Sequence, residues 1–262
     1  MRIILSVIVF LLWGDGISSQ GIVNADTLRL MTFNIYHGET IKGDFDLDYI
    51  ARIIQSKQPA FVALQELDFK TKRARDMDIV TELGLRSGMA PFFGPAMSFD
   101  GGAYGVGLLS KWPVEQSQLI QLPGSQTTEP RVALEVSVVL PSGRRLLFVS
   151  THLDHTDTEV RHQQMVFLSN RYNDRDEPVI LAGDFNEIPT GGNMQIILED
   201  FEMSDGYRQQ PTYPSSDAVS KIDYIFLSKG HYWQVITTEV VNDSIASDHR
   251  ALYSKVVLSD KE

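Results

Sequence analysis

The sequence predicts an α/β protein whose sheets are mixed and whose helices cover the sheets from outside. Two observations predict this class. Short apolar runs with the length of buried strands recur along the chain, and they outnumber the stretches with helical spacing. Several of these strands also follow one another directly, as at Pro141-Ser142-Gly143, which separates residues 132–140 from residues 146–151. A purely parallel, doubly wound sheet would instead alternate strand and helix throughout.

The first half of the chain contains both kinds of element. Residues 28–34 alternate large and polar side chains, as a strand does. Asp46 can cap a helix that has apolar residues at helical spacing and ends before Pro59. Residues 61–65 are an apolar run short enough for a buried strand, and residues 76–83 suit a short helix that Gly84 stops. Further strands are expected at residues 104–110, 132–140 and 146–151.

The second half follows the same pattern. Asp157 begins a helix with Val160, Gln164, Phe167 and Leu168 on one side. The remaining expected elements are a buried strand at residues 178–182, a short helix at 193–198, and strands at 222–227, 235–241 and 251–258. No linker or internal repeat interrupts this succession, so we predict one domain over residues 26–262.

Residues 1–25 have the layout of a secretory signal peptide. A charged start, Met1-Arg2, precedes an apolar run that ends at Trp13, and Val23-Asn24-Ala25 supplies small residues at cleavage spacing. The run is shorter than the roughly 17–25 residues that span a bilayer. We therefore expect cleavage after Ala25, a secreted or periplasmic protein, and no transmembrane segment in the mature chain.

Composition excludes several kinds of chemistry. The chain has no cysteine, which rules out a thiol nucleophile, thiolate zinc sites and iron–sulfur clusters. Its formal net charge of −11 comes from 34 acidic and 23 basic residues. Proteins that bind nucleic acid through its phosphates usually have a basic surface patch. The charge therefore disfavours a nucleic-acid partner and favours a small or localised substrate.

Polar residues occur where the predicted strands end, a place where sheet proteins often present functional groups. They are Asn34, Gln65-Glu66, His152, Asp154, Asp184, Asn186 and Asp248-His249. Taken singly, each is explained equally well as a turn residue, a strand cap or a hydrogen-bonded core residue. Asp223 is different, because an acid between Ile222 and Tyr224 in a buried strand is costly unless it is paired.

Together these residues resemble the motifs of the endonuclease/exonuclease/phosphatase superfamily. The matching segments, in the order of that family, are Thr32-Phe33-Asn34, Leu64-Gln65-Glu66, Ser150-Thr151-His152-Leu153, Gly183-Asp184-Phe185-Asn186, Lys221-Ile222-Asp223-Tyr224 and Ser247-Asp248-His249. Each is weak alone, but six in order cover nearly the whole expected mature chain. The resemblance implies a four-layer α-β-β-α sandwich of two mixed, mainly antiparallel sheets.

The resemblance also implies a role for each residue. Glu66, with Asn34 and Asp248 beside it, is expected to bind Mg²⁺ or Mn²⁺, which prefer oxygen ligands. Asp184 is expected to activate the attacking water, and Asp223 to pair with His249. The expected phosphate contacts are Asn186, His152 and His249, joined by Arg131, which follows Glu129-Pro130. Either histidine could donate the proton to the leaving group.

The expected activity is metal-dependent hydrolysis of a phosphoester by direct attack of water, with no covalent intermediate. Candidate substrates are esters of a small molecule, a lipid headgroup or a nucleotide, and both phosphodiesterase and phosphatase activity fit. The alternatives are a secreted nuclease acting on DNA or RNA and a non-catalytic module that binds a phospho-ligand with the same fold. We expect a monomer whose partner is its phosphoester substrate.

Overall fold

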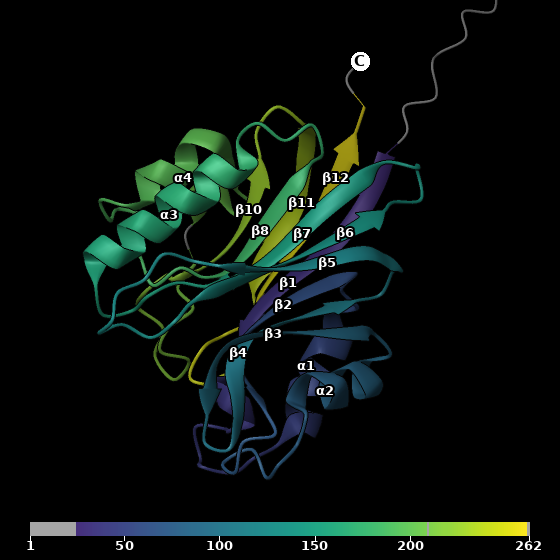
Figure 1. The fold of residues 1–262 in the computed structure, drawn as a ribbon. Coiled ribbons are helices and arrows are strands. Elements are labelled where there is room, and N and C mark those ends of the chain that lie inside the picture. Colours follow the sequence, from purple (N-terminus) through teal and green to yellow (C-terminus); the bar gives the residue numbers. More distant parts are fainter. Residues whose placement is uncertain (1–24, 209, 261–262) are drawn as a thin grey trace, which may run out of the picture.

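The computed structural model describes residues 25–208 and 210–260, and these form two six-stranded sheets packed face to face (Figure 1). The expected signal peptide falls on residues 1–24, outside the described residues, apart from its last residue, Ala25. None of the helices in the described ranges is long and apolar enough to span a bilayer.

The first sheet has the strand order β11-β12-β1-β2-β4-β3. Its strands are β1 (Ala25–Asn34), β2 (Phe61–Phe69), β3 (Ala90–Phe99), β4 (Gly102–Ser110), β11 (Tyr232–Val240) and β12 (Leu252–Ser259). Only β1 and β2 run parallel, and every other neighbouring pair is antiparallel.

The second sheet has the order β5-β6-β7-β8-β10-β9. Its strands are β5 (Val114–Gln121), β6 (Val132–Val139), β7 (Arg145–His152), β8 (Val179–Asp184), β9 (Phe201–Met203) and β10 (Asp223–Ser228). Here β7 and β8 are the single parallel pair. Both sheets are therefore mixed and mainly antiparallel, as predicted.

Helices cover the outer face of each sheet, which makes four layers (Figure 1). Helices α1 (Leu47–Lys57) and α2 (Ile79–Ser87) pack on the first sheet, and α3 (Thr158–Tyr172) and α4 (Met194–Asp200) pack on the second. Three apolar cores separate the layers. In the core between the sheets, Phe61 of β2 stacks on Phe148 of β7 with ring centroids 5.0 Å apart. The predicted α-β-β-α sandwich is confirmed.

The caps confirm the predicted helix starts at Asp46 and Asp157. Each side chain accepts a backbone N–H from the first turn of its helix, which satisfies a donor that the helix itself leaves free. The helix predicted at residues 76–83 begins instead after Asp78, passes through Gly84 and ends at Ser87, with Gly88 as its C-cap. Glycine is favoured at position 84 because a Cβ there would meet the Met89 carbonyl oxygen at 2.8 Å.

Sequence patterns did not reveal β3, β5 and β9. All three lie at sheet edges, where one side of the strand pairs with no other strand of the described residues and the burial pattern is weak. Strand β3 also contains Pro91 and Pro95, which favour a turn in a sequence-based interpretation but are acceptable on an edge strand.

Candidate active site

Strand pairing brings the predicted residues to one end of the sandwich. Asn34 is the last residue of β1, which is parallel to β2. His152 and Asp184 end the parallel strands β7 and β8 and lie opposite each other, and Asp223 begins the antiparallel strand β10 opposite Asp184. His249 lies just before β12, which runs antiparallel to β1. Residues far apart in the sequence thus meet at one edge.

Glu66 reaches the site through an irregularity in β2. The register between β2 and β4 shifts between Leu64 and Leu67, and Glu66 has a φ of 55°. A bulge of this kind bends the strand and re-aims a side chain that strict alternation would send elsewhere. A left-handed backbone at a non-glycine residue is costly, and such strain gathers at functional sites.

Asn34 connects the two carboxylates on which the predicted chemistry depends. Its Nδ2 donates to Glu66 Oε1 at 3.1 Å and to Asp184 Oδ2 at 3.2 Å, and it lies 3.5 Å from His249 Nε2. Its Oδ1 accepts the backbone N–H of Tyr36 at 3.2 Å. Glu66 and Asp184 therefore lie on the same side of the molecule, around one amide.

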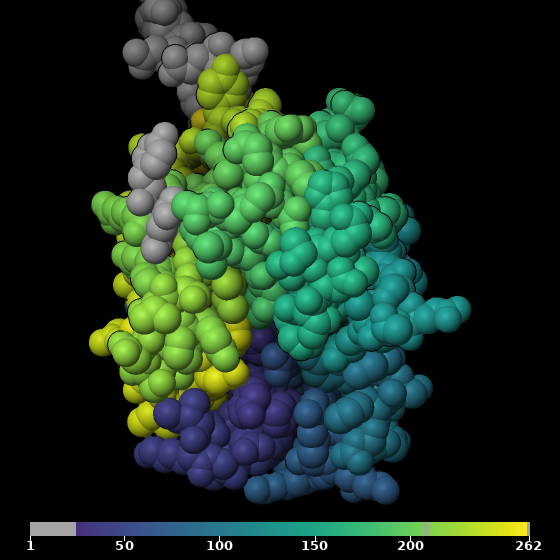
Figure 2. Space-filling view, turned by 90° about the vertical axis from the view of Figure 1, so that its left-hand side faces the viewer, coloured from purple at the N-terminus to yellow at the C-terminus, as the bar shows by residue number. Residues whose placement is uncertain are grey.

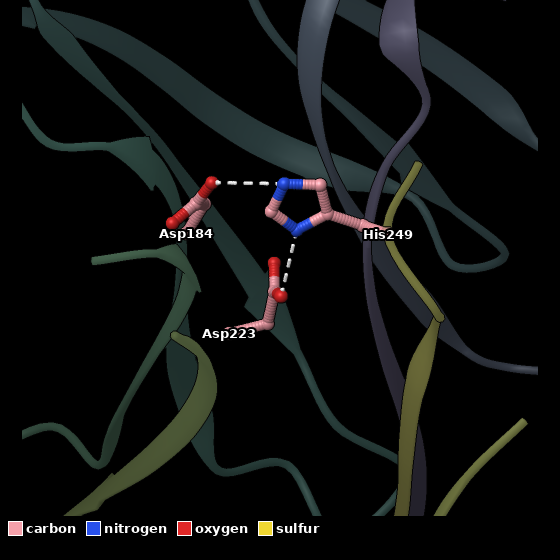
Figure 3. Close-up of side chains that lie close together, drawn as sticks. All are labelled: Asp184, Asp223 and His249. Carbon is pink, nitrogen blue, oxygen red and sulfur yellow. Dashed lines mark hydrogen bonds and ion pairs between the residues drawn. The ribbon is translucent and has the colours of Figure 1, made fainter. Parts of the chain in front are cut away.

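Asp223 has the partner that its burial requires. Its Oδ2 lies 2.9 Å from His249 Nδ1, and both side chains are almost fully buried (Figure 3). Burial alone would lower the pKa of His249, but the charge and hydrogen bond of Asp223, with Asp184 and Asp248 nearby, raise it to about 10. His249 is therefore an imidazolium at neutral pH, and its hydrogen bond to Asp223 fixes the orientation of the ring.

Asp184 lies between two histidines. Its Oδ2 is 3.7 Å from His249 Nε2 (Figure 3). The same oxygen lies 3.6 Å from His152 Nε2, while Oδ1 accepts the backbone N–H of Asn186 at 2.9 Å. Burial, together with the charge of Asp223, raises the pKa of Asp184 to about 7. Burial and the positive charge of Arg131 lower the pKa of His152 well below its ordinary value. The two histidines therefore differ in charge at neutral pH.

Two sets of residues could hold a cation. The predicted set contains Glu66 and Asp248, whose pKa values are both raised, first by burial; the charge of Asp248 raises the pKa of Glu66 further. No Lys or Arg forms an ion pair with either acid within residues 25–208 and 210–260. The second set is Asp184, Asp223 and His249, whose ligand atoms lie within 4.8 Å of one another.

These residues fit a hard divalent cation. Glu66 and Asp248 offer carboxylate oxygens to the same pocket, whereas Asn34 turns its amide nitrogen toward Glu66 and its oxygen toward the Tyr36 N–H. In the second set, His249 Nδ1 is occupied by its hydrogen bond to Asp223, and its Nε2 lies 3.7 Å from Asp184 Oδ2. Both sets therefore supply carboxylate oxygens that could bind a divalent cation.

The site opens into a cavity of about 490 Å³, which we call the catalytic pocket. Its walls include the predicted residues Glu66, Arg131, His152, Asp184, Asn186, Asp248 and His249. Arg131 is 4% exposed and contacts Glu129 and His155, each at 3.2 Å. Its Nε is buried without a partner among the described residues, as expected of a group that meets an anion. The Nδ2 of Asn186 donates to the Leu153 carbonyl at 3.0 Å, which fixes this amide at the rim.

A model of the Endonuclease/Exonuclease/phosphatase family matches residues 31–249, which contain all of these side chains. This chain belongs to that family. No curated protein matches the sequence as a relative.

Solved structures of the family share its fold. An endonuclease/exonuclease/phosphatase from Beutenbergia cavernae is 22% identical with a TM-score of 0.74, over 89% of this chain and 72% of that one. A mannosyl-6-phosphatase from Bacteroides thetaiotaomicron is 18% identical with a TM-score of 0.73, over 87% and 99%. The catalytic domain of human Nocturnin, solved with a sulfate anion, is 21% identical with a TM-score of 0.70, over 90% and 97%.

The family motifs do not account for the whole pocket. Tyr104, Glu129, His155 and Tyr213 also line it, and the ring of Tyr213 lies 4.8 Å from that of His249. The sequence predicts the strand around Tyr104 but indicates no role for its ring, and it indicates none for His155. No spacing rule could place Tyr213, because the segment before β10 folds back onto the site through contacts such as Ser215 N to the Asp248 carbonyl.

Proposed function

We propose that this protein is a divalent-metal-dependent phosphoester hydrolase that works by direct attack of water. One observation carries the proposal. Asp184, a buried acid with a raised pKa, touches Asn34 and lies between the ring nitrogens of His152 and His249. A base tuned toward neutral pH beside a fixed imidazolium is an arrangement suited to general acid–base catalysis.

In the proposed reaction, Asp184 accepts one proton and His249 donates another. Asp184 orients a water molecule and accepts its proton as the water oxygen forms a bond to phosphorus. The bond from phosphorus to the alcohol oxygen breaks, and His249 donates its proton to that oxygen. His249 is the better donor because its pKa is raised by Asp223, whereas the lowered pKa of His152 leaves that ring neutral. His152, Arg131 and Asn186 then serve as contacts for the phosphoryl oxygens.

Glu66 and Asp248, with Asn34, are proposed to hold Mg²⁺ or Mn²⁺. The bound cation would supply neutralisation of negative charge on the phosphate. Asn34 positions Glu66 through its hydrogen bond, and the backbone at Glu66 holds the carboxylate toward the pocket. We propose that the enzyme acts after export, as a monomer, on a small phosphoester. The excess of 34 acidic over 23 basic residues makes nucleic acid a poorer substrate.

An assay panel tests the proposal. The protein from Asp26 onward is incubated with Mg²⁺, Mn²⁺ or EDTA and with p-nitrophenyl phosphate, bis-p-nitrophenyl phosphate, plasmid DNA or sphingomyelin. We expect turnover of small esters that EDTA abolishes. Replacing Asp184 by Asn should lower kcat by between about 10² and 10⁴-fold, the usual contribution of general acid–base catalysis.

A matched pair of histidine variants provides the control. His249→Gln should abolish turnover, whereas His162→Gln should not, because His162 is bonded to Asn193 away from the pocket. Circular dichroism should show that both variants are folded. Metal-independent turnover, or phosphate binding without any turnover, would contradict the proposal; the second result would indicate a binding module instead.

A further inference from the structure

The side-chain amide of Asn186 lines the catalytic pocket and is bonded on one side only. An amide nitrogen carries two hydrogens, and Nδ2 donates one of them to the Leu153 carbonyl at 3.0 Å. The backbone of Asn186 has a φ of 50°, so a non-glycine residue adopts the left-handed region. This costly conformation persists only where surrounding contacts over-determine it. The direction of the second hydrogen therefore depends on what holds Asn186 and Leu153.

One guanidinium, that of Arg161, bonds the residues that follow these two. Its Nε donates to Glu187 Oε2 at 2.8 Å, and its Nη1 donates to the Asp154 carbonyl at 3.0 Å. Glu187 follows Asn186 in the loop after β8. Asp154 follows Leu153 in the loop after β7. Because a guanidinium is planar and its donors form a rigid fork, Arg161 fixes how far apart the two loops lie.

Glu187 is held by further contacts. Its Oε2 also accepts from Asn193 Nδ2 at 3.4 Å, and its backbone carbonyl accepts the Tyr224 hydroxyl at 2.8 Å. A Cβ at Gly191 would meet Glu187 Oε1 at 1.7 Å, so the carboxylate lies directly against the backbone of that glycine. Glu187 and Arg161 are each 9% exposed. The ion pair is therefore a fixed, buried contact.

The location of this pair indicates a role in orientation. Neither Arg161 nor Glu187 lines the catalytic pocket, so neither can contact a bound phosphate there. A buried ion pair is weak evidence for a stabilising role, because the loss of hydration offsets much of the attraction between the charges. Such a pair can instead select one conformation among several. Here it contacts the residue directly after Asn186, where the backbone is strained.

We propose that Arg161, paired with Glu187, is a positioning residue that points the second hydrogen of the Asn186 amide at a phosphoryl oxygen. Arg161 does so by holding the loop that carries the Leu153 carbonyl against the loop that carries Asn186. It contacts neither the substrate nor the attacking water. This inference rests on the proposed hydrolase function and adds a residue on which that function depends.

Arg161→Lys tests the geometry while keeping the charge. Lysine can still pair with Glu187, but a single ammonium cannot reproduce the rigid fork between Glu187 and the Asp154 carbonyl. With Mg²⁺ present, kcat/KM for p-nitrophenyl phosphate should fall by between about 10- and 100-fold, because a small misplacement of a positioned group costs this much. Arg171→Lys is the matched control, because Arg171 lies near the other end of α3 and bonds Gln118. Its kcat/KM should change by less than about twofold.

A double-mutant cycle separates positioning from a general structural role. Asn186→Ala removes the amide through which Arg161 is proposed to act, and loss of one such donor lowers kcat by about 10²–10³-fold. In protein that already carries Asn186→Ala, Arg161→Lys should lower kcat/KM by less than about threefold, because the effects of residues that act as a unit are not additive. A structural role would lower kcat/KM by the same factor in both backgrounds.

Amide hydrogen exchange measures the positioning without any activity. The Asn186 N–H donates to Asp184 Oδ1 and the Leu153 N–H donates to the Asp184 carbonyl, each at 2.9 Å. Both amides should exchange at least about tenfold faster in Arg161→Lys, a factor equivalent to one hydrogen bond. The amides of β6 report global unfolding and should keep wild-type rates. In Arg171→Lys, all of these amides should exchange as in the wild-type protein.

Equal losses of activity in the two backgrounds of the cycle would overturn the proposal. So would full activity in Arg161→Lys, or wild-type exchange of the Asn186 and Leu153 amides. Should Arg161→Lys fail to fold, Arg161→Met combined with Glu187→Met replaces it in both measurements, because this variant leaves no unpaired buried charge.

The two measurements also separate this inference from the proposed function. If the wild-type protein hydrolyses no ester, the proposed function fails, and hydrogen exchange alone decides the role of Arg161. Faster exchange of the Asn186 amide in Arg161→Lys would then support the positioning of that residue, and unchanged exchange would overturn it as well.

Discussion

The amide nitrogen of Asn34 connects three functional side chains of this site. It contacts Glu66, Asp184 and His249, so it joins the carboxylate proposed to bind the metal, the proposed base and the imidazolium. These three residues come from different strands or loops, and a small movement of any of them would open the site. A second contact on which the site depends is the hydrogen bond between Asp223 and His249, because it raises the pKa of His249.

The pKa values predict the pH dependence. Activity needs Asp184 ionised and His249 protonated, so kcat/KM should rise as pH approaches about 7 and fall as pH passes about 10. Asp223 raises the pKa of His249, so Asp223→Asn should move the alkaline limb downward, toward the ordinary value of 6.5. Steady-state kinetics between pH 5 and 11 measure both limbs. An alkaline limb that stays in place in Asp223→Asn would show that His249 is not the group that titrates.

The parallel pair β7 and β8 positions the site at the scale of elements. Its register sets His152 against Asp184, and the two strands approach closely because Gly183 lies opposite Thr151. A Cβ at Gly183 would meet the Thr151 carbonyl oxygen at 2.0 Å, a clash that only movement of backbone could relieve. The closeness of these strands is therefore a requirement for the site as well as for the sheet.

Gly183→Ala should destabilise the protein and lower its activity together. Overpacking of this kind costs about 1–3 kcal/mol, equivalent to a fall of roughly 3–10 °C in Tm. Gly192→Ala is the control, because a Cβ at Gly192 meets nothing within 4 Å. Scanning calorimetry and the p-nitrophenyl phosphate assay on both variants test this. Full activity and an unchanged Tm in Gly183→Ala would mean that the two strands separate without cost.

The whole molecule is a sandwich whose site lies at one end, where early, middle and late segments of the chain meet. Figure 2 shows this meeting on one face, with purple, blue, green and yellow segments in contact. Because both sheets contribute side chains, anything that binds in the catalytic pocket joins the first sheet to the second. Ligand binding should therefore stabilise the complete fold.

Addition of Mg²⁺ or Mn²⁺ should raise the Tm of the wild-type protein. A cation at 100 times its Kd stabilises the folded state by about 2.7 kcal/mol. Glu66→Gln should lose most of this increase while keeping the hydrogen bond with Asn34. Thermal unfolding with and without metal measures it. Equal shifts in the wild-type protein and in Glu66→Gln would exclude Glu66 as a ligand and point to Asp184, Asp223 and His249 instead.

The proposed export predicts a defined start of the mature chain. Cleavage after Ala25 leaves Asp26, which is 4% exposed and accepts the backbone N–H of Ser142 at 3.1 Å. Amino-terminal sequencing of protein secreted from a host cell should therefore begin at Asp26. A start further along β1 would remove a buried contact of the fold and contradict the predicted cleavage site.

The sequence by itself determined the fold class, the helix starts at Asp46 and Asp157, and the family motifs from Asn34 to His249, because periodicity, caps and strand-end residues are local signals. Tertiary structure alone decided which of these residues touch. The bend at Glu66 and the contacts of Asn34 with Glu66 and Asp184 depend on segments far apart in the sequence. Strand pairing brings Asn34 and Glu66 together, and the packing of the two sheets brings Asp184 to them, so no spacing within one segment encodes these contacts.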